Sequence, residues 1–276
     1  MSKTDKSCGP VDQASIAAAI QRLGRNAGGY FGERIAIAAV LSELESCAAS
    51  EGWETGRLSA GPDVALPVFR RWTREGARQI YLSTGIHGDE PAGPLAALEL
   101  LKENCWPSDA NLWLCPCLNP SGFLRNSRES AAGVDLNRDY KHRRSPEVRA
   151  HIAWLEQQPA FDLCLCLHED WEAHGFYVYE VNPLGLPSLA NRMVQAVRSI
   201  CPIDHSAEID GRPAQDGIIR PVLDPAQRPE WPEAYYLYMN QRSRVGYTLE
   251  APSDFPLSVR VAALATAVKT ALAQEG

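Results

Sequence analysis

The sequence lacks the features that mark several specialised classes of protein. None of its apolar runs approaches the roughly 18 residues that a membrane-spanning helix needs, and its first ten residues contain no apolar core of a secretory signal. It has no block of Lys and Arg and carries a formal charge of −7, so it presents no electrostatic footprint for nucleic acid. We therefore expect a cytoplasmic protein that binds neither nucleic acid nor membranes.

Disulfide bonds are not expected either, although the chain has 8 Cys. There is no Cys-x-x-Cys, and the pairs Cys115/Cys117 and Cys164/Cys166 lie inside apolar runs. Alternation along a strand puts both members of such a pair on one face. Because Cys is among the most buried residue types, reduced core thiols are favoured over bridges or a thiolate metal site.

The chain shows no internal repeat and no charged or Gly/Ser-rich linker. We expect a single domain over residues 1–276, with residues 1–63 as an N-terminal helical segment packed on it. Within residues 12–50 two stretches have helical spacing, the second being Arg34–Ala49.

Beyond these residues, apolar strands alternate with helices. The expected strands are Val64–Trp72, Gln79–Ile86, Asn111–Leu118, Phe161–His168, Phe176–Val181 and Arg244–Glu250. The expected helices are Pro91–Glu103, Pro146–Gln157, Leu189–Ile200, Pro232–Asn240 and Leu257–Gln274. This alternation predicts an α/β fold whose sheet is covered by helices on both faces.

Polar residues follow the carboxyl ends of these strands, where α/β sheets bind their ligands. His87 and Glu90 stand three residues apart where a helix begins, so both can point toward one metal ion; a carboxylate in the first helical turn is the alternative. His168 ends another apolar strand and would complete a two-His, one-carboxylate set that suits zinc, although a hydrogen-bonded core histidine is the commoner role.

Other strand ends and loops carry candidate anion-binding and acid–base groups. Arg125 ends the run Asn-Pro-Ser-Gly-Phe-Leu-Arg, and Arg138 ends Gly-Val-Asp-Leu-Asn-Arg. A guanidinium can hold a carboxylate through two hydrogen bonds or stabilise an oxyanion, whereas surface arginines in a loop are the alternative. Glu250 ends a late strand and could act as a general base or lie exposed.

Together and in this order, these elements resemble the zinc carboxypeptidase family, the metallocarboxypeptidases related to carboxypeptidase A. The resemblance runs from about Val64 to the C-terminus, and Gly-Val-Asp-Leu-Asn-Arg is its most specific element. His-Gly-Asp-Glu has Asp89 where digestive members usually have Arg, and is closer to the compact bacterial branch and the related succinylglutamate desuccinylases and aspartoacylases. The resemblance implies one three-layer α/β/α domain around a mixed, mostly parallel sheet.

The resemblance also implies a role for each matching residue. It implies one Zn²⁺ per chain, held by His87, Glu90 and His168. Arg125 would polarise the scissile carbonyl, and Asn137 and Arg138 would hold the terminal carboxylate of the substrate. Glu250 would be the acid/base toward zinc-activated water.

The sequence therefore predicts a zinc metallocarboxypeptidase, a hydrolase acting on a peptide with a free C-terminal carboxylate. An N-acyl amino-acid deacylase or a cell-wall peptide amidase would use the same residues, so these alternatives stay open. A non-catalytic binding protein would not require the whole set. The mobile substrate tyrosine of the family has three candidates, Tyr235, Tyr236 and Tyr238, and Asp216 and Asp224 are candidates for reading a basic side chain.

Overall fold

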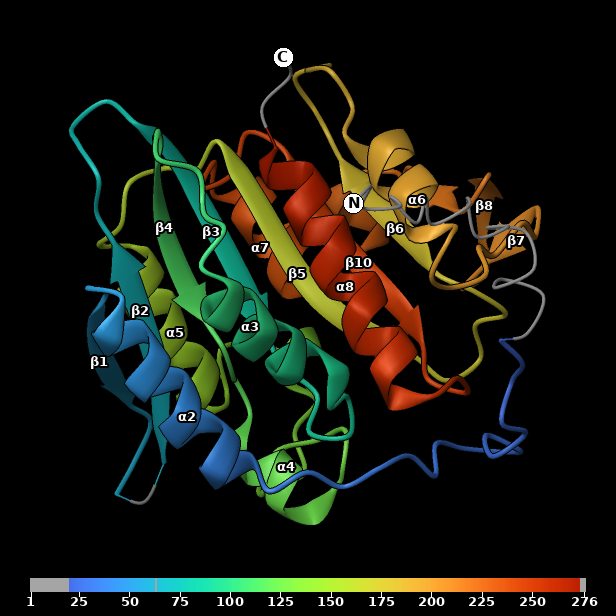
Figure 1. Ribbon diagram of the computed structural model, residues 1–276, viewed down its shortest axis with the longest axis horizontal. Helices are drawn as coiled ribbons and strands as arrows, with labels where there is room; N and C mark the ends of the chain where they lie inside the picture. Colours follow the sequence, from blue (N-terminus) through green and yellow to red (C-terminus); the bar gives the residue numbers. More distant parts are fainter. Residues whose placement is uncertain (1–19, 63, 274–276) are drawn as a thin grey trace, which may run out of the picture.

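The computed structural model describes residues 20–62 and 64–273, and its framework is a sheet with helices on both faces (Figure 1). The described strands run in the order β1-β2-β4-β3-β5-β10-β6-β9-β8-β7. Their bounds are β1 Glu54–Ser59, β2 Ala65–Arg71, β3 Arg78–Thr84, β4 Ala110–Cys115, β5 Leu163–Asp170, β6 Tyr177–Val181, β7 Glu208–Ile209, β8 Arg212–Gln215, β9 Ile218–Ile219 and β10 Gly246–Pro252. The α-helices are α2 Ile37–Ser50, α3 Ala92–Glu103, α4 Pro120–Arg125, α5 Pro146–Leu155, α6 Ala190–Val197, α7 Glu233–Met239 and α8 Leu257–Leu272. The 3-10 helices are η1 Leu136–Arg138 and η2 Pro225–Gln227.

The sheet is mixed, with parallel strands at its centre. β4, β3, β5 and β10 pair in parallel, whereas the pairs β1–β2, β2–β4 and β10–β6 are antiparallel. Parallel pairing brings the carboxyl ends of β5 and β10 together, and Glu250 is the register partner of His168. The α/β class and the mixed sheet predicted from the sequence are therefore confirmed.

The two largest apolar clusters of the described residues lie on opposite faces of the sheet. Helices α2, α3, α6 and α8 cover one face, where they pack on alternate strand residues such as Leu82, Leu165 and Leu249 (Figure 1). Helices α5 and α7 cover the other face, which carries Trp113 and Cys164. The described cysteines are free, and none of the described helices has the length and apolar character to cross a membrane.

From residue 64 onwards the predicted helices and strands agree with the structure to within three residues at each end. Arg34–Ala49 corresponds to α2, whereas the other helical stretch expected within residues 12–50 falls partly on residues 1–19, outside the described residues. The prediction that residues 1–63 are helical is wrong for β1, which pairs along β2. β1 is mostly exposed and has few apolar residues, so it carries no strong periodic signal.

We expect the central strands to dominate the free energy of unfolding. Leu165 on β5 is 0% exposed, so Leu165→Ala should lower that free energy by about 2–5 kcal/mol, through lost burial and a residual cavity. Leu184→Ala is the matched control, because Leu184 is 60% exposed and its truncation should change stability by less than about 0.5 kcal/mol. Urea unfolding of both variants measures the difference, and equal effects would contradict this account of the core.

Candidate metal centre and substrate pocket

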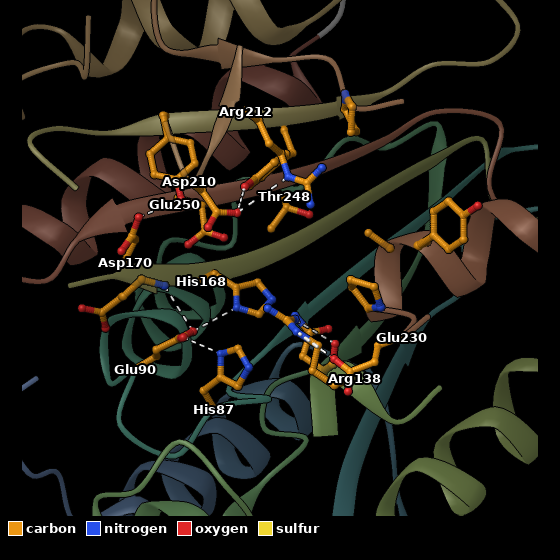
Figure 2. Close-up of a pocket in the computed structure, with 18 of the residues that line it drawn as sticks. His87, Glu90, Arg138, His168, Asp170, Asp210, Arg212, Glu230, Thr248 and Glu250 are labelled. Carbon is orange, nitrogen blue, oxygen red and sulfur yellow. Dashed lines mark hydrogen bonds and ion pairs between the residues drawn. The ribbon is translucent and has the colours of Figure 1, made fainter. Parts of the chain in front are cut away.

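Three potential metal ligands converge beyond the carboxyl ends of β3 and β5. Glu90 lies between two imidazoles: one carboxylate oxygen hydrogen-bonds to Nδ1 of His87, and the other lies 3.0 Å from Nδ1 of His168 (Figure 2). One ligand atom from each residue lies within 4.8 Å of the others, and all three side chains are buried. Two nitrogen donors and one carboxylate oxygen fit a catalytic zinc site with an open position, so the residues present suit that metal.

A close contact between two backbone segments places His87. A Cβ atom on Gly88 would lie 2.1 Å from the carbonyl carbon of Gly122, closer than real atoms approach. Gly122 is held in turn by Asn119, whose side-chain oxygen accepts its N–H at 2.9 Å and caps α4. The glycines of His-Gly-Asp-Glu and Asn-Pro-Ser-Gly therefore let α4 lie against the segment that carries the candidate ligands His87 and Glu90.

The loop after α4 supplies two site residues that the sequence reasoning missed. Asp135 accepts a hydrogen bond from Nε2 of His87 at 3.2 Å and one from Nε of Arg128 at 2.9 Å. Burial would raise the pKa of Asp135, but the hydrogen bond from His87 and the charges of His87 and Arg128 hold that pKa well below its usual range. Since an ionised carboxylate only accepts, Nε2 of His87 is the donor toward Asp135, and this bond fixes the imidazole with Nδ1 facing Glu90. Asp135 belongs to the Gly-Val-Asp-Leu-Asn-Arg run, which could have signalled it.

Arg128, and not the predicted Arg125, lies beside the candidate metal ligands. The guanidinium of Arg128 lies 3.8 Å from Glu90 and lines the pocket. Arg125 is not among the residues that line the pocket: it is exposed at the end of α4 and donates a hydrogen bond to the carbonyl of Ala131 at 2.9 Å. The path of the loop after α4 thus decides which arginine lies beside the candidate metal ligands.

Asn137 and Arg138 lie in the same pocket, which has a volume of about 610 Å³. The side-chain oxygen of Asn137 accepts the backbone N–H of Glu233 at 2.9 Å, so its amide NH₂ remains available as a donor. Arg138 donates to the carbonyl of Asn137 at 3.0 Å and lies 3.8 Å from Glu230 (Figure 2). The remaining guanidinium N–H groups can bind an anion.

Glu250 completes the set on β10, beside His168. Burial raises the pKa of Glu250 well above its usual range, and the charge of His168 only partly offsets this. Burial and the charge of Glu90 also raise the pKa of Asp89 to about 6. Asp210, in the turn after β7, and Arg212, at the start of β8, also line the pocket. The sequence analysis did not find them, because strands of two and four residues are too short to give a periodic signal.

Of the three tyrosines that the sequence offered as candidates for a mobile substrate tyrosine, one lines the pocket. Tyr235 lines the pocket, whereas Tyr236 is buried against Tyr140. Tyr238 contacts Tyr235 and does not line the pocket.

The two acidic candidates do not line the pocket either. Asp224 caps η2, and Asp216 lies 3.9 Å from an exposed histidine, His205. The structure therefore gives neither residue a position from which to read a substrate.

Solved structures share this architecture. A candidate metallopeptidase from Shewanella denitrificans is 24% identical, with a TM-score of 0.74 over 85% of this chain and 88% of that one. A candidate metallopeptidase from Shewanella amazonensis is 24% identical, with a TM-score of 0.75 over 89% and 99%. A metallo-carboxypeptidase from Pseudomonas aeruginosa, in complex with (2-guanidinoethylmercapto)succinic acid, is 20% identical, with a TM-score of 0.61 over 83% and 66%. At these identities the likeness shows the fold, and that fold is zinc carboxypeptidase-like.

Two sequence matches agree with the fold. The model of the succinylglutamate desuccinylase/aspartoacylase catalytic domain matches residues 76–183. Carboxypeptidase SOL1 of Arabidopsis thaliana is 34% identical over 91 residues, which are 25% of this chain and 18% of that protein. The match thus spans less than a fifth of that relative. The resemblance to the zinc carboxypeptidases, near the succinylglutamate desuccinylase and aspartoacylase branch, is confirmed.

Metal binding should depend on the histidines of this cluster. His168→Ala removes one of three ligands, so the purified protein should lose most of its zinc after dialysis against metal-free buffer. His205→Ala is the matched control, because the His205 side chain is 55% exposed and lies outside the cluster. Metal content by atomic emission spectrometry decides the matter, and full zinc retention in His168→Ala would contradict the assignment of this ligand.

Proposed function

We propose that this chain is a zinc-dependent metallocarboxypeptidase that hydrolyses the C-terminal peptide bond of a peptide. One observation carries the proposal: a single pocket is lined by the His-Glu-His cluster, by a buried carboxylate and by an arginine with free donors. His87, Glu90 and His168 would hold the zinc. Bound there, zinc would supply Lewis acidity, which polarises a carbonyl and lowers the pKa of a water molecule.

The acid–base role falls to Glu250. Its carboxylate lies in the pocket on the strand next to His168, and its raised pKa suits a group that takes up a proton and later releases it to the leaving amine. Arg128, fixed by Asp135 beside Glu90, would donate hydrogen bonds to the carbonyl oxygen as negative charge develops on it.

Substrate orientation would come from the opposite side of the pocket. Arg138 can hold the terminal carboxylate through two parallel N–H groups, and the Asn137 amide NH₂ can donate a third hydrogen bond. The Pseudomonas aeruginosa structure holds a succinic acid derivative, which carries two carboxylates, and this agrees with carboxylate binding in a pocket of this fold.

A second candidate is an N-acyl amino-acid deacylase, because the catalytic-domain model of succinylglutamate desuccinylase and aspartoacylase matches residues 76–183. Such an enzyme would use the same ligands and the same acid–base group. Incubation of the zinc-loaded protein with a peptide library and with acylated amino acids, followed by mass spectrometry, separates the two. Release of C-terminal residues supports the carboxypeptidase, and exclusive release of acyl groups supports the alternative.

Arg138→Ala should raise KM for a peptide with a free C-terminus. The lost hydrogen bonds to a charged group are worth about 1.5–3 kcal/mol, roughly 10- to 150-fold in kcat/KM. Arg138→Lys should not restore binding, because Lys lacks the planar fork of donors. The amidated peptide should be a poor substrate for the wild type and lose little more in Arg138→Ala. Equal losses on both peptides would exclude a carboxylate clamp.

Arg128 and Arg125 should differ sharply in their contribution to turnover. Arg128→Ala should lower kcat by roughly 100- to 1,000-fold, as removal of one oxyanion donor does. Arg125→Ala, three residues away and exposed, should change kcat by less than about threefold. Steady-state kinetics of both zinc-loaded variants give the answer, and the reverse order would return the carbonyl-polarising role to Arg125.

A further inference from the structure

Arg260 occupies an unusual position for a charged residue. Its side chain is 0% exposed and lies in the first turn of α8, where the helix dipole disfavours a cation. Its guanidinium bonds to the equally buried Glu169, to Glu33 and, at 2.9 Å, to the carbonyl of Phe255. Buried ion pairs of this kind are weak sources of stability, because desolvation offsets their attraction. Stability alone therefore does not account for Arg260.

Glu169 links this pair to the proposed metal ligands. It follows His168 at the end of β5, and its backbone N–H donates to Glu90 at 3.2 Å. Its carboxylate accepts the N–H of Ala92, the first residue of α3, at 2.6 Å. The Glu169 side chain thus joins the end of β5 to the start of α3, and these two segments carry two of the three ligands.

We propose that Arg260 is a positioning residue of the metal centre, which acts by holding the Glu169 carboxylate against the start of α3. The proposal rests on the metal site of the proposed function. The guanidinium and the N–H of Ala92 hold the two oxygens of the Glu169 carboxylate, so the end of β5 stays fixed to the start of α3 and the spacing between Glu90 and His168 is kept. Outer groups that fix ligand geometry commonly change metal affinity 10- to 100-fold when they are removed.

The outer contact of the same guanidinium provides a matched control. Glu33 is 28% exposed and belongs to the segment before α2, which also brings Tyr30 to the pocket wall. Glu33→Gln removes the negative charge that contacts the outer side of the Arg260 guanidinium, and it leaves the bond between Arg260 and Glu169 intact. If Arg260 acts through Glu169, this variant should keep its zinc affinity.

The test measures zinc affinity by competition with a chromophoric chelator, together with urea unfolding of the metal-free protein. Arg260→Met should weaken zinc binding at least 10-fold and alter the visible absorption of the Co²⁺-loaded protein, which reports ligand geometry. Arg260→Met/Glu169→Leu leaves no unpaired buried charge, so it should be more stable than the single variant and still bind zinc at least 10-fold more weakly than wild type. Glu33→Gln should stay within threefold of wild type.

Three results would overturn the proposal. They are wild-type zinc affinity in the folded double variant, wild-type affinity in a folded Arg260→Met variant, and an equal loss in Glu33→Gln. Zinc binding by the wild type without peptide hydrolysis would refute the proposed reaction alone, because these readouts do not depend on turnover. A wild type that binds no zinc would overturn both.

Discussion

The parallel pairing of β3, β5 and β10 is the constraint on which the site depends. It ends three strands at one edge of the sheet and makes His168 and Glu250 register partners. Because side chains alternate along a strand, His168 and Glu250 both face the side of the sheet covered by α7. Leu167 and Leu249, one residue earlier on each strand, fill the core under α3 and α8. One local pattern therefore builds the core and aims the polar side chains at the pocket.

The part of the pocket wall that carries Asn137 is held by a buried polar network. Glu233, in the first turn of α7, accepts hydrogen bonds from Tyr81 at 2.6 Å and Ser83 at 2.9 Å on β3. Its backbone N–H is the group that orients the Asn137 amide. The hydroxyl of Tyr81 also lies 2.9 Å from His151 on α5. The orientation of this pocket-lining amide is thus determined by residues that do not themselves line the pocket.

Two ion pairs flank the candidate metal ligands: the Asp135–Arg128 pair is partly buried and the Glu169–Arg260 pair is fully buried. Asp135 with Arg128 orients His87 from the loop after α4, and Glu169 with Arg260 ties the end of β5 to the start of α3. Each pair combines a carboxylate that accepts a hydrogen bond from one of the segments carrying the candidate ligands with an arginine bonded to that carboxylate. Rigid support of this kind keeps ligand atoms converged, which a metal site with an open position requires.

The sequence by itself determined the α/β class, the longer helices and strands from residue 64 onwards but not α4 or β7 to β9, and the positions of His87, Glu90, His168 and Glu250 at or just after strand ends. These features follow from periods of 2 and 3.6 residues and from motif spacing, which are local. Only the tertiary structure decided that Arg128 and not Arg125 lies beside Glu90, that Asp135 holds His87, and that Arg260 reaches Glu169. Those contacts depend on backbone segments that approach each other only in the folded chain, such as Gly88 against Gly122. Local periodicity carries no information about such approaches.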